Sequence, residues 1–309
     1  MPLYYRNLRS TIASSGGPMT GKRLEGFDMP EDYIRLDKYL LKYCPVLVDF
    51  VSLPERKWDV LSRRFGQRMN KINIGVSEQG ALVAETTLHD LIVQAEADIA
   101  IAKNFLLFID NVFKDVLKFV PAHHHAKLRQ AARNLLSNFD IQRSAYLDPL
   151  GELKALLSLL KNSDYKLIEI EFKLSNGKSA DYYLIHPSGH KILIDVLNIH
   201  FKDGRIRNEV DLLSFLSKRI QDKLGEKTSG VDFMQLGKQF KLLPVVWCDF
   251  KDVHEYTAAF DTVEANFGTL PFCVMGQTSM GDGSYTFHFS TVKRLIEAYQ
   301  KQINYGSGA

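Results

Sequence analysis

Hydrophobic residues repeat with a helical period in several stretches between residues 31 and 145 of the chain. The longest such pattern covers 82–120, where apolar residues recur every three or four positions and neither glycine nor proline interrupts them. This pattern predicts one long helix or two shorter ones, ending before Pro121, which cannot continue a helix. A further helix is expected over 122–139. Because no stretch of strict alternation occurs here, we expect this part to be mainly helical.

The hydrophobic pattern changes to a period of two after residue 166. Over 167–174, Ile168, Ile170, Phe172 and Leu174 alternate with charged or polar residues, which predicts a strand with these four side chains on one face. Further apolar runs, a Pro-Ser-Gly-His turn and two amphipathic stretches surround it. The expected order is a helix, three strands, a helix and a strand, over 150–160, 167–174, 181–186, 191–199, 208–224 and 243–250.

This change of pattern also predicts the domain organisation. A chain of 309 residues is long enough for about two domains. We expect a flexible arm over 1–30, a helical domain over 31–145 and an α/β domain over 146–309. The last of these is extended by two later strands and a helix for which Ser290 is the expected N-cap.

Composition narrows the class of protein. With 45% hydrophobic and 24% charged residues, the chain has the composition of a folded globular protein. Its three cysteines are too few for a disulfide framework, and we expect a cytoplasmic, intracellular location. No apolar run is long enough to span a membrane. The net charge is only +3, so any nucleic-acid-binding surface must be local.

Three acidic residues stand at separate places in the predicted α/β order. Glu152 lies on the first helix, Asp181 begins the second strand, and Asp195 interrupts an apolar third strand. A carboxylate such as Asp195 is costly to bury without a partner, and either a metal ion or a nearby lysine or arginine would compensate it. Asp181, alternatively, merely begins its strand.

In this order and spacing, residues 149–250 resemble the PD-(D/E)xK nuclease superfamily. The resemblance implies a restriction-endonuclease-like αβββαβ core with a mixed sheet, in which Glu152, Asp181 and Asp195 are the metal ligands. It further implies that Mg²⁺ or Mn²⁺ activates water for phosphodiester cleavage, with both aspartates catalytic.

The chain departs from the family pattern at two positions. Ala180 stands where the motif has proline, and Leu197 stands where it has the catalytic lysine. A substitute cation would have to come from elsewhere, and Lys173 on the first strand and Lys223 on the following helix are the candidates. Glu209, Leu216 and Lys223 are seven residues apart and share one helix stripe, which places Lys223 near the inward side, although its ammonium could instead extend into solvent at the helix end.

Basic residues gather most densely over 56–71, where there are six of them and one acidic residue. Trp58 and Phe65 lie among them, a combination suited to phosphate contacts and base stacking, although an amphipathic helix with a solvated face has the same composition. A second basic segment follows the third strand. The candidate nucleic-acid contacts are Arg56, Arg63, Arg64, Arg68, Lys202, Arg205 and Arg207.

Two classes of function remain open from the sequence. The first is a magnesium-dependent nuclease that acts on or binds DNA, with activity reduced by the missing lysine. The second is a non-catalytic interaction protein that uses a nuclease-like scaffold for a nucleic-acid or protein partner. Fold alone does not distinguish between these classes.

Overall fold

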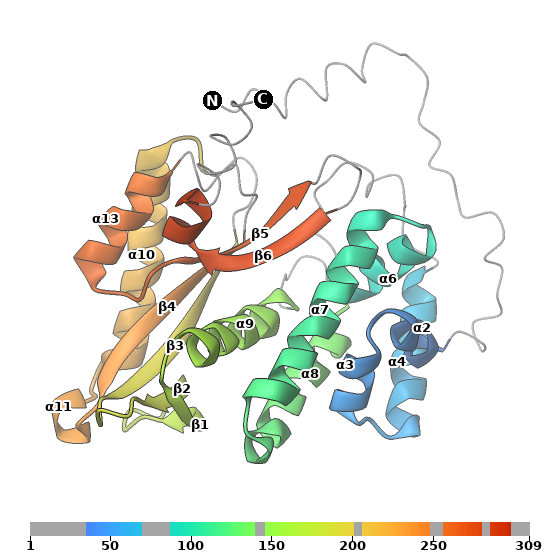
Figure 1. The fold of residues 1–309 in the computed structure, drawn as a ribbon, viewed down its shortest axis with the longest axis horizontal. Coiled ribbons are helices and arrows are strands. Elements are labelled where there is room, and N and C mark those ends of the chain that lie inside the picture. Colours follow the sequence, from blue (N-terminus) through green and yellow to red (C-terminus); the bar gives the residue numbers. More distant parts are fainter. Residues whose placement is uncertain are drawn as a thin grey trace, which may run out of the picture.

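A mixed six-stranded sheet with helices on both faces organises the protein (Figure 1). The computed structural model describes residues 35–69, 87–139, 146–200, 206–247, 256–279 and 285–297. The strands follow one another across the sheet in sequence order. They are β1 (Lys166–Lys173), β2 (Ser179–Ile185), β3 (Lys191–His200), β4 (Gln239–Trp247), β5 (Cys273–Ser279) and β6 (Tyr285–Thr291).

Most helices precede the sheet, and the others connect β3 to β4 and β4 to β5 or follow β6. Those before β1 are α2 (Leu36–Tyr43), α3 (Pro45–Val51), α4 (Glu55–Met69), α6 (Leu88–Glu96), α7 (Ala100–Phe119), the short 3₁₀ helix η3 (Ala122–His124), α8 (His125–Ser137) and α9 (Leu147–Asn162). Those after β3 are α10 (Glu209–Thr228), α11 (Phe233–Leu236), α13 (Thr257–Phe267) and a last helix over 292–297. The predicted α/β class and the order helix, three strands, helix, strand are confirmed. The predicted arm over 1–30 lies outside the described residues.

The connections explain the mixed direction of the strands. β1, β2 and β3 are antiparallel neighbours, joined by tight turns in which Gly177 and Gly189 take positive φ angles of 81° and 85°. β3, β4 and β5 run parallel. Parallel neighbours need a crossover, which α10 and α13 supply. β6 returns antiparallel to β5.

The long hydrophobic pattern over 82–120 forms two helices within its described part. α6 begins at a capping box, in which the Thr87 side chain accepts from the Asp90 backbone and the Asp90 carboxylate accepts from the Thr87 backbone. The chain then turns at Asp98, whose φ of 66° is left-handed, and α7 follows. The second of the two predicted alternatives is therefore the observed one.

Two local predictions were wrong. The β1–β2 register shifts between Leu167 and Glu169, so Leu167 is buried while Ile168 is 44% exposed. A shift of one residue sends a side chain to the opposite face, and the expected one-sided row of apolar residues is broken there. Ser290, the expected N-cap, lies inside β6, and the hydroxyl of Thr291 instead accepts from the Arg294 backbone.

The hydrophobic core lies on both faces of the sheet. One cluster joins residues of α2, α7, α8 and α9 to side chains of β1 to β5. A second cluster packs α10 and α13 against the other face. Figure 1 shows α9 lying against one face, between the sheet and α7 and α8. No helix in the described ranges is both long and apolar enough to cross a lipid bilayer.

Candidate functional site

The candidate site lies where β2 and β3 separate. Their ladder extends from the pair Ile185 and Lys191 to the pair Tyr182 and Ile194. The next residue on β2 is Asp181, whose Oδ2 accepts a hydrogen bond of 2.7 Å from the backbone N–H of Val196. A side-chain carboxylate thus binds a strand N–H just beyond the end of the ladder. This bond fixes Asp181 beside Asp195.

Asp195 is fully buried and is compensated by two lysines of α10. Lys223 Nζ lies 3.1 Å from Asp195 Oδ2, and Lys227 Nζ lies 2.5 Å from Asp195 Oδ1. Lys227 also donates to the Ser179 carbonyl at 2.6 Å. Each carboxylate oxygen therefore has its own ammonium group, which offsets the cost of burying the charge.

The two lysines extend the apolar stripe by which α10 packs on the sheet. Leu216 and Ile220 are buried in this stripe, and Lys223 and Lys227 follow Ile220 by three and seven residues. Positions at these spacings lie on one face of a helix. Lys223, a candidate from the sequence, reaches the acids. Lys227 was missed, although the same spacing rule could have found it.

Burial and neighbouring carboxylates raise the pKa values of Glu152 and Asp181 towards neutral pH. Burial, followed by the charges of Asp181, Asp148 and Asp195, raises the pKa of Glu152 to about 8. Burial and the charge of Asp195 raise the pKa of Asp181 to about 7, against the opposing hydrogen bond from Val196. Glu152 therefore senses the charges of Asp181 and Asp195, and Asp181 that of Asp195, so the three predicted acids form one electrostatic cluster.

The Lys223 ammonium interacts electrostatically with all three of these acids. Burial opposes its charge, but Asp195 and then Asp181 more than compensate and raise the pKa of the Lys223 ammonium. Lys223 in turn acts to lower the pKa of Glu152 and that of Asp181. It is partly exposed, whereas Lys227 is buried.

A pocket of about 410 Å³ opens beside Glu152 and Asp181. Its walls come from α8, α9, β1 and β2, so the helical part of the chain contributes to it. Glu171, opposite Asp181 on β1, takes a positive φ of 57°, a strained conformation for a residue with a side chain. The polar residues that line the pocket are Lys127, Gln130, Asn134, Asn138, Asp148, Glu152, Glu171, Asp181 and Tyr182.

Neither of the other two positions discussed for the catalytic cation supplies an ammonium group to the acids in the part of the chain that the structure describes. Lys173 is exposed at the end of β1, paired in register with Ser179, and takes part in none of the ion pairs found among the described residues. Leu197 is buried among Leu212, Leu216 and other apolar residues of the second core cluster. A leucine here completes the packing of α10 instead of facing the pocket.

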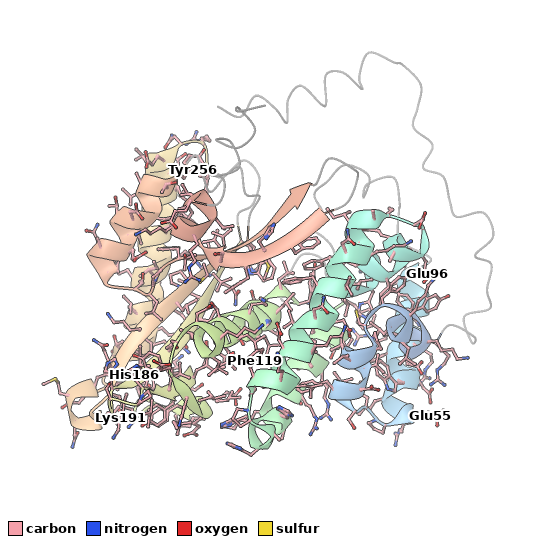
Figure 2. All side chains as sticks on the ribbon, in the orientation of Figure 1. Glu55, Glu96, Phe119, His186, Lys191 and Tyr256 are labelled. Carbon is pink, nitrogen blue, oxygen red and sulfur yellow. The ribbon has the colours of Figure 1, made fainter. Side chains whose placement is uncertain are left out.

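The predicted basic surface lies on α4, in the helical part of the chain. α4 packs on α2 and α6, and Figure 2 shows Glu55, at the start of α4, on the opposite side of the molecule from His186 and Lys191 at the β2–β3 turn. Arg68 forms a two-pronged ion pair with Asp90.

The remaining predicted contacts differ in their exposure. Arg64 lies over the ring of Phe139, with 4.3 Å between its guanidinium carbon and the ring centre. Arg56 and Arg63 are exposed. Arg207 is exposed and pairs with Asp211, while Lys202 and Arg205 lie outside the described residues.

The donor set beside the pocket fits a hard divalent cation through two carboxylates. Glu152 and Asp181 supply oxygen ligands, and Mg²⁺ is commonly held by one or two carboxylates with several waters. Asp195 differs because both of its oxygens face lysines. Within the described ranges, no group of three histidine, cysteine or acidic side chains is arranged to hold a metal ion.

Comparisons with known proteins give little further information. No protein-family model matches the chain, and no curated protein sequence matches it. Among solved structures it is similar to SfsA from Pyrococcus furiosus, determined in complex with Ca²⁺, with 13% sequence identity and a TM-score of 0.22. The match covers 46% of this chain and 61% of that chain, so this chain spans less than two thirds of the length of SfsA.

Proposed function

We propose that the protein is a divalent-metal-dependent, nuclease-like protein that acts on or binds DNA, with Mg²⁺ or Mn²⁺ as its cation. One observation carries the proposal: Glu152 and Asp181 line a pocket and interact electrostatically with Asp195, which two lysines of α10 contact. Burying this many ionisable groups together is costly for a purely structural element and is typical of catalytic sites.

In this proposal Glu152 and Asp181 hold the cation. When bound, the cation would lower the pKa of a water molecule and neutralise charge on a phosphodiester. The raised pKa values of both carboxylates mean that protons compete with the cation below pH 7 to 8. Asp195 fixes the lysines, and the Asp181 bond to Val196 orients its carboxylate.

Lys223 takes the place of the motif lysine in this proposal. Its ammonium is partly exposed and touches Asp195 through one contact, so it retains donors for a phosphate oxygen. A positioned cation of this kind stabilises charge that develops during cleavage. Lys173 forms no ion pair with a described residue, and the proposal gives it no role.

Cleavage of labelled DNA tests this proposal. Single-stranded and duplex oligonucleotides would be incubated with Mn²⁺ or Mg²⁺ and the wild-type protein, Asp181→Asn or Lys223→Met. The matched control is Asp164→Asn, which changes an aspartate whose side chain is 85% exposed. We expect cation-dependent cleavage that the first two variants lose and the control retains. Equal cleavage by wild type and Asp181→Asn would contradict the proposal.

A non-catalytic interaction protein is the second candidate, and a specific observation favours it. The motif lysine position is filled by Leu197 in an apolar cluster, and Asp195 is fully compensated by lysines. In that case the charged groups hold α10 on the sheet. Binding of DNA without cleavage at any divalent cation concentration would support this candidate.

A further inference from the structure

Polar contacts dock the first turn of α9 onto the ends of β3 and β4. His200 Nε2 lies 2.7 Å from Asp148 Oδ1, and Asn198 Nδ2 donates to the Asp148 carbonyl at 3.1 Å. Trp247 Nε1 donates to Asn198 Oδ1 at 3.0 Å, and its ring stacks with His200 at 5.9 Å between ring centres. Residues of β3 and β4, 50 or more positions beyond Asp148 in the chain, thus hold one helix turn.

The same contacts require a glycine on α9. A Cβ added to Gly151 would lie 2.0 Å from Asn198 Oδ1 and 3.3 Å from the Trp247 ring. Glycine inside a helix costs about 1 kcal/mol relative to alanine, so its presence needs a compensating reason. The close approach of α9 to β3 supplies that reason.

We infer that Asp148, Gly151, Asn198 and His200 form a positioning network for Glu152. This inference rests on the proposed function, in which Glu152 holds the cation. Glu152 directly follows Gly151, and Asp148 lies one helical turn before it, lining the same pocket. Because Asn198 and His200 belong to the strand that carries Asp195, the network fixes Glu152 relative to the other acids.

The geometry explains why a network is needed here. Glu152 lies on a helix, whereas Asp181 and Asp195 lie on strands, so their separation depends on how α9 sits on the sheet. Apolar contacts of α9 define the packed face but are not directional. Hydrogen bonds of 2.7 to 3.1 Å to the end of β3 set the position along the helix axis.

The test compares two glycines, both on helices. Gly151→Ala should push α9 away from Asn198, whereas Gly225→Ala on α10 meets no atom within 4 Å and serves as the matched control. The double variant Gly151→Ala, Asn198→Ala removes the side chain that the new Cβ would meet. Crystal structures of the full-length variants and Mn²⁺ affinity, measured by titration calorimetry, are the two readouts.

We expect Gly151→Ala to displace Glu152 and weaken Mn²⁺ binding about 10-fold or more, as substitutions behind metal ligands commonly do. The double variant should bind more tightly than Gly151→Ala, and Gly225→Ala should bind as wild type does. His200→Gln, which can still donate to Asp148, should retain more affinity than His200→Ala.

An unmoved Glu152 in Gly151→Ala would overturn the inference whether or not the metal binds. Equal Mn²⁺ affinity of Gly151→Ala and wild type would also overturn it. Absence of Mn²⁺ binding by the wild type would instead contradict the proposed function, and the crystal structures would then still decide whether the network positions Glu152.

Discussion

Removing the ammonium of Lys227 should destabilise the protein far more than removing a comparable ammonium at the surface. In Lys227→Met the side chain keeps its length and apolar stem, but Asp195 Oδ1 and the Ser179 carbonyl lose their partner. Breaking a buried ion pair by removing one partner costs about 3 to 5 kcal/mol. Because Lys223 still contacts Asp195, we expect about 3 kcal/mol, at the lower end of that range.

Urea unfolding measures this loss. The control is Lys178→Met, which removes an ammonium 2.9 Å from Glu226, where both side chains are about half exposed. Exposed pairs of this kind contribute roughly 0 to 1 kcal/mol. The urea concentration at the unfolding midpoint should fall strongly for Lys227→Met and little for Lys178→Met. The slope of the unfolding free energy against urea concentration should not change.

The double variant Lys227→Met, Asp195→Asn separates the loss of the pair from the cost of an uncompensated charge. It removes the carboxylate charge together with its partner, so it should recover most of the lost stability. A loss for Lys227→Met no greater than that for Lys178→Met would refute the reasoning.

Three further predictions concern other parts of the protein. Burial lowers the pKa of His89 to about 3, so the folded state excludes a proton that the unfolded state binds below pH 6.5. The stability of the wild type should therefore fall as the pH drops from 6.5 towards 3, by up to about 1.4 kcal/mol per pH unit. His89→Phe should reduce this dependence on pH, as measured by urea unfolding at several pH values. Arg68→Ala should lose about 1.5 to 3 kcal/mol of stability, because it removes the ion pair with Asp90. Arg56→Ala and Arg63→Ala should leave stability unchanged. If Arg56 and Arg63 contact DNA, each substitution should reduce the slope of log affinity against log salt concentration by about 0.9 per duplex phosphate contact. Leu197→Lys should lower the thermal midpoint more than Leu197→Met, because the ammonium would enter an apolar cluster; equal midpoints would contradict this.

The order of elements was predictable because it depends on local periodicity. Strands over 167–174 and 191–199 and the helices around them follow from spacing alone, and so does the inward position of Lys223 on α10. The register shift at Ile168 was not predictable, because it depends on how β1 meets β2.

The candidate site was predictable only in part, for a related reason. Asp195 drew attention because it interrupts an apolar strand, but its two lysine partners are 28 and 32 residues away and are set by the docking of α10. The contact of Asp148 with His200 joins residues 52 apart. Such pairs depend on tertiary packing, which spacing along one element does not report.

Manganese binding as a function of pH tests the central claim most directly. Wild type, Glu152→Gln and Asp181→Asn would be titrated with Mn²⁺ at pH 6.0, 7.0 and 8.5, values chosen to bracket the pKa values of about 8 for Glu152 and about 7 for Asp181. The cation must displace protons from both carboxylates, so wild-type affinity should rise with pH and each variant should lose most of it. Wild-type affinity that is independent of pH and is retained in both variants would contradict the account.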